Sequence, residues 1–385
     1  MRISLVMTGT PDHPIRNGMD LYRLYMPYSK IDGVTINLKH DLIGAKLDAD
    51  VYVINRAYPV ELFRYIKEQG KKIILDLDDH WDIPTWHRLH PKRLEANIQH
   101  AKSLNLDHEA QMLQRQLDEV VSWKHQLNEV VKIVDAVTVS TPMLCAYYVK
   151  QFGILPTIVP STIAPEITRF TTKKQPSRFT RFGFIAGTFR ERDAALMHKG
   201  IQRSFKDQEL KGKWQLIQTF NAHGSYAEQE RNFTNNYTNV SEWYRDYLKK
   251  FIEQGNHVAN QQWYKRVWAM DAVNYGKMYE EVDVALIPMQ HGVFNSCKSE
   301  LKLIEAGFTG CAAIVSDVMP YAPYLEHNVN CIATKEDQGW YRGIRELTLN
   351  KELRHKLAWN LQETMFEHFN HNRADAAVHT LLNTL

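Results

Sequence analysis

Short apolar runs alternate with amphipathic stretches along the whole chain. The apolar runs, which indicate buried strands, are residues 2–7, 50–56, 72–75, 135–140, 158–160, 181–186, 214–220, 267–270, 282–288, 311–316 and 331–333. Helical periodicity lies between or after them, at 60–68, 107–132, 274–281 and 351–385, and a helix around Tyr22 and Arg23 should end at Pro27. Strand, helix and strand within about 35 residues form a parallel βαβ unit. The pattern therefore predicts an α/β fold with parallel sheets.

A stretch rich in Thr, Lys, Ser and Pro at residues 161–180 divides this pattern into two halves and has the composition of a linker. A chain of 385 residues is long enough for two domains. We predict an N-terminal domain at 1–165, a C-terminal domain at 178–350, and closing helices at 351–385 that pack back across the hinge.

The composition is that of an ordinary globular protein, with 44% hydrophobic and 24% charged residues. The net charge of +3 permits nucleic acid as a partner without demanding it. No apolar run approaches 18 residues, and the first residues are too few for a signal sequence. The 4 cysteines lack CxxC spacing, which predicts reduced thiols in a cytoplasmic protein.

The segment 294–310 is the strongest candidate for chemistry. A helix is expected there, capped by Asn295 or Ser296 and ended by Gly310. At 100° per residue, Lys298, Lys302 and Glu305 fall within about 60° of one another on one face. Cations beside a helix N-terminus suit a nucleoside diphosphate, and a glutamate can accept hydrogen bonds from ribose. The alternative is a solvated face with an ion pair between Lys302 and Glu305.

A second candidate is the cluster of ionisable residues that follows the strand at 72–75, namely Asp76, Asp78, Asp79 and His80. Asp76 and Asp78 form a DxD pair, which in one class of sugar-transferring enzymes holds a divalent metal on the donor diphosphate. The alternatives are a helix N-cap and hydrogen bonding to acceptor hydroxyls. A metal is the less favoured interpretation, because carboxylate pairs occur by chance in many sequences.

Loops supply further candidates. The turn at 187–193 combines small residues with arginines and can approach a phosphate. The loop at 8–18 contains His13 but does not match GxGxxG. Residues 84–104, rich in His, Arg and Lys, are expected to be an exposed loop on the acceptor side. The basic and aromatic segment 221–262 is either a helical insertion, an oligomer contact or a nucleic-acid surface.

These motifs together resemble the GT-B glycosyltransferases of the family 4 type (glycosyl transferases group 1), and the resemblance covers both halves of the chain. Its most specific part is an FN-x-x-KS-x-LK-x-x-EA core followed by G-x-x-x-IVSD. The residues that carry the resemblance are Gly18, Tyr22, Arg23, Pro27, Arg56, 76–79, 135–142, Gly187, Thr188, Arg190, Asp193, Tyr275, Asp283, Pro288, 294–306, Gly310, 316–317 and 320–321.

The resemblance implies a GT-B fold of two facing Rossmann-like domains, with a C-terminal helix that crosses back to the first domain. It places a UDP- or GDP-type nucleotide sugar on the second domain, where Glu305 would hold the ribose and Lys298 with Ser299 the diphosphate. Further donor-binding residues would be Gly187, Thr188, Arg190, Asn295 and Lys302. Many members have a glutamate at the position of Cys297, which leaves the sugar open.

The resemblance also places the acceptor on the first domain. His13, Arg23 and Arg56 would lie on the acceptor side. Asp78, Asp79 and His80 would position the acceptor hydroxyl. Family members commonly retain the anomeric configuration and need no metal, so no cofactor is expected.

The main hypothesis is therefore a hexosyl- or pentosyltransferase (EC 2.4) that moves a sugar from a nucleotide diphosphate to an acceptor hydroxyl. The acceptor could be a hydroxymethylated base in DNA, as in phage-like DNA modification, a surface or lipid-linked glycan, or a protein. A second hypothesis is a non-catalytic nucleic-acid-binding protein with a relic nucleotide site. A third is a metal-dependent, single-domain GT-A transferase built on Asp76 and Asp78. The oligomeric state is not predicted.

Overall fold

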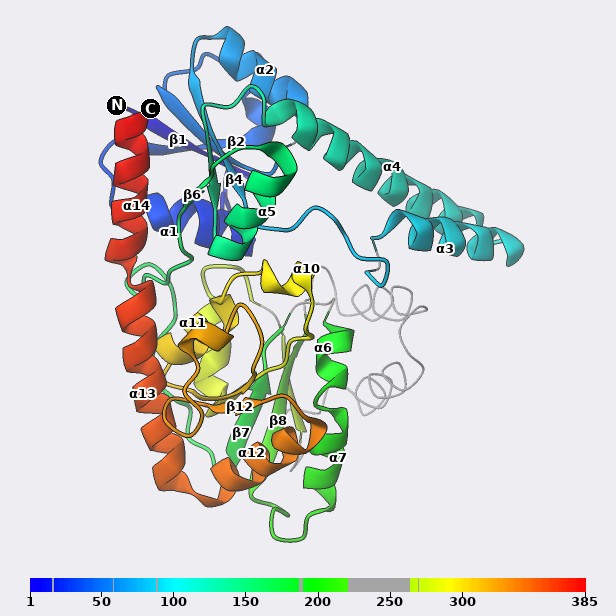
Figure 1. Cartoon of the computed structure of the whole chain (residues 1–385), viewed down its shortest axis with the longest axis vertical. Coiled ribbons are helices and arrows are strands. Elements are labelled where there is room, and N and C mark those ends of the chain that lie inside the picture. Colours follow the sequence, from blue (N-terminus) through cyan, green and yellow to red (C-terminus); the bar gives the residue numbers. More distant parts are fainter. Residues whose placement is uncertain (16, 58, 88, 187–189, 221–263, 269) are drawn as a thin grey trace. The chain divides into compact units, whose positions relative to one another are not determined.

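The computed structural model describes residues 1–15, 17–57, 59–87, 89–186, 190–220, 264–268 and 270–385. The chain forms two compact units (Figure 1). Unit 1 consists of Met1–Ser161, Gly292–Ser299 and His371–Leu385, and unit 2 of Thr162–His291 and Glu300–Asn370. Each unit contains one parallel six-stranded sheet, so the predicted α/β class is confirmed.

The sheet of unit 1 has the order β2-β1-β3-β4-β5-β6. Its strands are β1 (Ile3–Met7), β2 (Val34–Leu38), β3 (Val51–Asn55), β4 (Lys72–Leu77), β5 (Ala136–Val139) and β6 (Thr157–Ile158). Every one except β2 overlaps a predicted apolar run. The sequence pattern does not reveal β2 because this edge strand alternates polar and apolar residues and is only half-buried.

The helices of unit 1 are η1 (Asp20–Tyr25), α1 (Met26–Tyr28), η2 (Lys39–Asp41), α2 (Val60–Glu68), α3 (Pro91–Ser103), α4 (Asp107–Val130), α5 (Pro142–Phe152), α10 (Val293–Ser296) and α14 (His371–Thr384). Thr141 caps helix α5, since its Oγ1 accepts a hydrogen bond from the Leu144 N–H at 3.2 Å. The first helix does not end at Pro27, which instead occupies the first turn of α1.

The expectation of an exposed loop over 84–104 is wrong for its second half. Residues 91–103 form α3, which pairs with α4 as a helical hairpin (Figure 1). Pro91 occupies the first turn, and His90 Nδ1 caps the helix by accepting from the Lys92 N–H at 3.2 Å. Leu94, Ile98 and Ala101 recur at helical spacing and are buried, so an apolar stripe stabilises a segment whose other positions are polar.

The sheet of unit 2 has the order β12-β11-β10-β7-β8-β9. Its strands are β7 (Thr180–Phe184), β8 (Trp214–Phe220), β9 (Tyr264–Trp268), β10 (Val284–Ile287), β11 (Ala312–Ser316) and β12 (Ile332–Thr334). Counted from β7, this is the 3-2-1-4-5-6 order of a Rossmann sheet. Its strand order reverses between β7 and β10, and ligands bind beyond the carboxyl ends of strands at such a switch point.

The helices of unit 2 among its described residues are α6 (Glu191–Ala195), α7 (His198–Lys206), η4 (Tyr275–Glu281), α11 (Leu301–Phe308), η5 (Ala322–Tyr324), α12 (Asp337–Leu349) and α13 (Lys351–Phe369). Asn370, in an extended conformation, separates α13 from α14. Because α14 belongs to unit 1 and packs Ala374 and Val378 into a core with Leu5, the predicted return of the C-terminal helix is confirmed.

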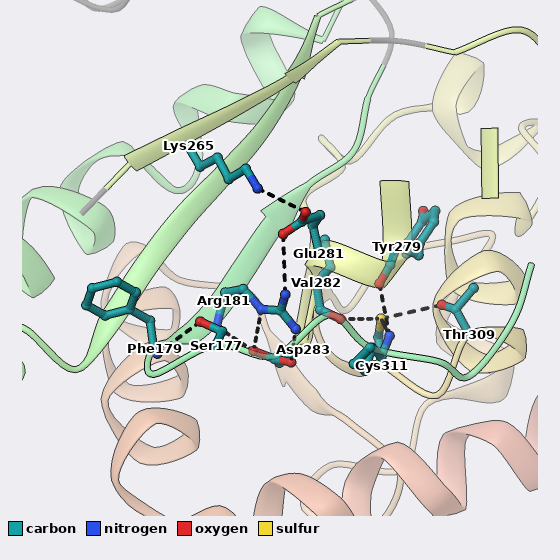
Figure 2. A network of polar contacts seen from close by, with 11 residues as sticks. Ser177, Phe179, Arg181, Lys265, Tyr279, Glu281, Val282, Asp283, Thr309 and Cys311 are labelled. Carbon is teal, nitrogen blue, oxygen red and sulfur yellow. Dashed lines mark hydrogen bonds and ion pairs between the residues drawn. The ribbon is translucent and has the colours of Figure 1, made fainter. Parts of the chain in front are cut away.

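A polar network joins the amino ends of the strands in unit 2 (Figure 2). The buried Arg181 of β7 donates to Asp283 at 2.8 and 3.1 Å and lies 3.4 Å from Glu281, which also pairs with Lys265 at 2.9 Å. Nearby, Cys311 Sγ donates to the Val282 carbonyl at 3.3 Å. The network secures β7, β9 and β10 to one another at the edge opposite the switch-point loops, so we interpret it as scaffold.

Candidate active site

A buried carboxylate connects two segments at the switch point of the second sheet. Asp193, in α6, accepts from the Gln290 N–H at 2.8 Å, so it connects the segment after β7 to the segment after β10. Its other oxygen accepts from Arg190 Nη1 at 3.0 Å. Asp193 is buried, whereas 30% of the Arg190 side chain is exposed. Asp193 therefore holds the partly exposed guanidinium of Arg190 at the switch point, where ligands bind in sheets of this order.

Lys302 and Glu305 form the centre of a second cluster in unit 2. Lys302 Nζ lies 2.6 Å from Tyr275 Oη and 2.7 Å from Glu305 Oε2, and Tyr279 donates to the same carboxylate oxygen at 2.6 Å. The ammonium also lies 4.7 Å from the centroid of the Tyr275 ring. Glu305 is fully buried, while 27% of the Lys302 side chain remains exposed. The lysine is thus the solvent-facing end of a buried polar network.

The charges in this cluster support one another. Burial lowers the pKa of Lys302, but the Glu305 carboxylate and Tyr275 outweigh it, so the net effect is a raised pKa. Burial raises the pKa of Tyr275 to about 12, although the adjacent ammonium acts in the opposite direction. At neutral pH the cluster therefore presents a fixed ammonium held by a carboxylate and neutral tyrosines.

The continuous helix predicted over 294–310 is wrong. The segment forms α10 and α11, separated by residues 297–300, and Glu300 rather than Asn295 or Ser296 precedes α11. Cys297 packs in the core of unit 1, and its carbonyl accepts from Thr141 Oγ1 at 3.4 Å. Because α10 ends at Ser296 and α11 begins at Leu301, Lys298 does not share a helix face with Lys302.

Lys298 lies instead among residues of unit 1. Its Nζ is 3.4 Å from Asp79 Oδ1 and 4.6 Å from the centroid of the Phe294 ring. Phe294 also contacts Trp86 and His80, with ring centroids 5.8 and 6.0 Å apart. Asn295, in α10, is buried, and Ser299 ends this segment half-exposed. Among the described residues predicted to bind the donor, Arg190, Lys302 and Glu305 belong to unit 2, and Asn295, Lys298 and Ser299 belong to unit 1.

The aspartates after β4 have different environments. Asp76 is buried and pairs with Arg23, whose Nη2 lies 2.7 Å from Oδ1 and whose Nε lies 3.2 Å from Oδ2. Thr138 Oγ1 and Asn55 Nδ2 donate to the same carboxylate at 2.7 and 2.9 Å. A metal between Asp76 and Asp78 would have to displace Arg23. The arginine predicted for the acceptor side is buried, and its Nη1 donates to the Val159 carbonyl at 2.7 Å.

Asp78 is the unusual acid of the group. Burial, and then the neighbouring Asp79 carboxylate, raise the pKa of Asp78 to about 6, while Arg56 acts in the opposite direction. Asn55 Nδ2 reaches Asp78 Oδ1 at 3.4 Å as well as Asp76, so it connects the buried ion pair to this carboxyl group. Sequence reasoning missed Asn55, although its position at the end of β3 beside Arg56 was a usable signal.

His80 and Asp79 complete this edge. His80 is buried, its ring lies 3.8 Å from that of Tyr147, and burial lowers its pKa. Its Nδ1 has no hydrogen-bond partner within the described part of the chain. Asp79 keeps 45% of its side chain exposed. A neutral imidazole, a carboxyl group that titrates near neutrality and an exposed carboxylate can together orient a hydroxyl and accept its proton.

The loop after β1 is closed tightly by its own backbone. Thr10 and His13 exchange hydrogen bonds of 3.1 and 3.0 Å, and a Cβ on Gly9 would lie 2.1 Å from the His13 carbonyl oxygen. His13 is exposed above this turn. Arg56, at the end of β3, has a φ of 67° and its Nη2 lies 2.8 Å from Met19 Sδ. Both residues therefore lie at the carboxyl edge of the first sheet, as expected for strand-end residues.

Gly187, Thr188 and the segment 221–262 lie outside the described residues. Within the ranges that the structure describes, no group of three or more His, Cys, Asp or Glu side chains is arranged to hold a metal. Among the same residues, no helix is both long and apolar enough to cross a membrane. The cysteines are free thiols.

No family model and no curated protein matches this sequence. Solved structures do match the fold. HepE of Anabaena in complex with UDP and glucose is 11% identical, with a TM-score of 0.60 over 100% of this chain and 99% of that chain. Sucrose-phosphate synthase of Thermosynechococcus elongatus is 11% identical, with a TM-score of 0.61 over 100% and 98%.

A third similar structure is the UDP-forming α,α-trehalose-phosphate synthase of Burkholderia xenovorans in complex with glucose-6-phosphate. It is 10% identical, with a TM-score of 0.61 over 100% of this chain and 99% of that chain. At such low sequence identity, these similarities establish the fold and not the function. The single-domain GT-A hypothesis is wrong, because the chain has a second Rossmann sheet. The protein has the two-domain α/β architecture of the GT-B fold.

Proposed function

We propose that this protein is a glycosyltransferase that transfers a sugar from a nucleoside-diphosphate sugar to an acceptor hydroxyl. The observation that carries the proposal is the Lys302–Glu305 cluster in a unit whose sheet has Rossmann order, together with Arg190 held by Asp193 at its switch point. Both cations are partly exposed, and both are fixed by buried carboxylates. Fixed positive charge is what a departing diphosphate needs.

In this proposal Arg190 and Lys302 bind the diphosphate. Glu305, predicted to hold the ribose, is wholly buried, and its Oε2 lies within hydrogen-bond distance of Tyr279 Oη and Lys302 Nζ. We therefore assign it a further task, which is to orient Lys302. Uridine is the favoured base, because similar folds include HepE in complex with UDP. Nucleotide hexoses and nucleotide pentoses are both candidate donors.

On the acceptor side, Asp78 is proposed to receive the hydroxyl hydrogen bond, with Asp79 and His80 beside it. The acceptor oxygen forms a bond to the anomeric carbon while the bond from that carbon to the donor phosphate oxygen breaks. The proton passes to the departing phosphate, which is the retaining route, or to Asp78. No metal is assigned a step. A hydroxymethylated DNA base and a surface glycan are the acceptors predicted from the sequence.

The test begins with the donor. UDP, GDP and ADP are titrated into the full chain by calorimetry, and hydrolysis of UDP-sugars and GDP-sugars is followed by release of the nucleoside diphosphate. One diphosphate should bind clearly more tightly than the others, and its sugar conjugates should be hydrolysed slowly.

Lys302→Met should weaken binding of the preferred nucleotide about tenfold or more, because a charge-assisted contact to phosphate is worth roughly 1.5–3 kcal/mol. Lys199→Met is the matched control, since Lys199 belongs to the same unit and 78% of its side chain is exposed. Binding of nucleic acid without binding of any nucleotide would instead favour the non-catalytic alternative, and the glycosyltransferase proposal would be abandoned.

A further inference from the structure

Two cations lie at one level along the carboxyl edge of the first sheet. In the strand register Met7 pairs with Leu38 and Val6 with Ile54. Extending both registers past the strand ends places Lys39, Thr8 and Arg56 side by side, just beyond β2, β1 and β3. With strands about 4.8 Å apart, the backbones of Lys39 and Arg56 are about 10 Å apart. The sequence pattern did not indicate Lys39 as a strand-end residue, because it did not predict β2, the edge strand before it.

These cations act on each other. Burial and then the Arg56 guanidinium lower the pKa of Lys39 to about 8, against the opposite influence of Asp20. Asp20 is itself buried and accepts from Thr8 Oγ1 at 2.8 Å. On the lysine's own element, His40 and Asp41 are exposed and pair with each other at 3.3 Å. Two half-buried cations that repel each other are expected where an anion binds.

The backbone of Arg56 points to the same conclusion. A φ of 67° lies in the left-handed region, which is unfavourable for an arginine. The Arg56 N–H donates to the Asp76 carbonyl at 3.1 Å, which ties this conformation to the strand that leads to Asp78. Backbone strain of this kind concentrates at functional sites. The position is also the β1–β3 switch point of the first sheet.

The edge is polarised along its length. Lys39 and Arg56 follow β2 and β3, whereas Asp78 and Asp79 follow β4, the next strand of the sheet. We propose that Lys39 and Arg56 form an anion subsite for the acceptor, and that the acceptor is a small phosphorylated sugar. Its phosphate monoester contacts the two cations while a hydroxyl of the same molecule lies toward Asp78. This inference rests on the proposed function.

A dianionic monoester fits the pair of cations better than a polyanion does. Further along the edge, Asp79 and Asp82 keep 45% and 44% of their side chains exposed, and each forms an ion pair with one lysine, Lys298 and Lys124 respectively. A nucleic-acid backbone that ran past the cations would meet these carboxylates, whereas a short acceptor with one charged end avoids them. A soluble sugar phosphate is therefore favoured over DNA.

The experiment measures binding to the full chain in the presence of UDP. Inorganic phosphate, glucose 6-phosphate, mannose 6-phosphate, ribose 5-phosphate and the corresponding free sugars are titrated at pH 7 and pH 9. At least one phosphorylated sugar should bind tenfold or more tightly than its free sugar. With a pKa of about 8, the protonated fraction of Lys39 falls about tenfold between pH 7 and pH 9. The affinity for the phosphorylated sugar should therefore fall by a similar factor.

Variants separate charge from structure. Lys39→Met should lose the preference for phosphate together with its pH dependence. Lys39→Arg should keep the preference but show a flat profile from pH 7 to 9, because an arginine stays charged. Lys46→Met is the matched control, since 91% of that side chain is exposed in the same unit, and it should behave like the native protein.

The outcomes are distinct. If UDP binds but no phosphorylated sugar is preferred, the anion subsite is wrong and the glycosyltransferase proposal stands. If DNA competes with inorganic phosphate more strongly than every sugar phosphate does, the small acceptor is wrong. A phosphate preference that survives in Lys39→Met overturns the assignment of Lys39. If neither UDP nor any other nucleotide binds, the proposed function itself fails.

Discussion

Replacing Asp78 with asparagine should make the protein more stable while it removes transfer activity. The pKa of Asp78 is about 6 in the folded protein, mainly because the group is buried and adjacent to Asp79. An aspartate in an unfolded chain has a pKa of about 3.9, and a difference of about two units corresponds to roughly 3 kcal/mol. Above pH 6 the native protein therefore carries a charge that destabilises its fold by up to that amount.

The direction in which stability changes with pH follows from proton binding. Between about pH 4 and pH 6 the folded protein holds a proton that the unfolded chain has released, so stability falls as the pH rises through this window. Asp78→Asn keeps an acceptor for Asn55 but cannot ionise. At pH 7.5 it should be about 2–3 kcal/mol more stable than the native protein, and most of this gain should be absent at pH 4.

Urea unfolding at pH 4 and pH 7.5 tests this expectation, with Asp48→Asn as the control. Asp48 has 71% of its side chain exposed, so its replacement should change stability by less than about 0.5 kcal/mol at either pH. The turnover of Asp78→Asn should fall about 10²–10⁴-fold if the carboxylate accepts the proton. Equal destabilisation of Asp78→Asn at both pH values would refute the reasoning, because the carboxylate would then be a stabilising acceptor.

Other substitutions test the framework around the site. Gly9→Ala should destabilise the protein by about 1–3 kcal/mol in thermal melting, because its Cβ would meet the backbone at 2.1 Å, whereas Gly18→Ala meets only a ring at 3.5 Å and should be tolerated. Arg23→Met should cost about 3–5 kcal/mol in urea unfolding, since it removes the cation that pairs with a buried carboxylate; a smaller loss would mean that the hydrogen bonds from Thr138 and Asn55 suffice to stabilise Asp76. Lys302→Met should also lower the melting temperature, and adding Glu305→Gln should recover part of the loss; no recovery would argue against a charged pair.

The strands and their order of appearance were predictable because parallel strands buried on both sides are continuous apolar runs. β2 was not, since Thr35 and Asn37 interrupt its pattern on the half-buried edge. Helix α3 was missed because its buried stripe is narrow and its remaining residues are polar. Periodicity therefore identified the layers of the fold better than their borders.

The candidate site was predictable at the level of strand ends and not of contacts. The sequence could place the residues after β4 and β10 at the carboxyl ends of parallel strands, where side chains from neighbouring strands gather. The interruption after Ser296 was not foreseeable from periodicity, and the Cys297 thiol beside it packs against residues far away in the sequence. The pairing of Asp76 with Arg23, 53 positions apart, likewise depends on tertiary structure.

The interleaving of the two units has a consequence for dissecting the protein. Unit 1 contains both termini (Figure 1). Its core includes Leu5 from the first strand and Val378 from the last helix. A fragment cut after Ser161 would leave that apolar surface uncovered and should aggregate. A single polypeptide in which residues 371–385 are joined by a short linker to Met1 would supply the missing helix. Autonomous folding of unit 1 should therefore depend on reordering the gene and not on trimming it.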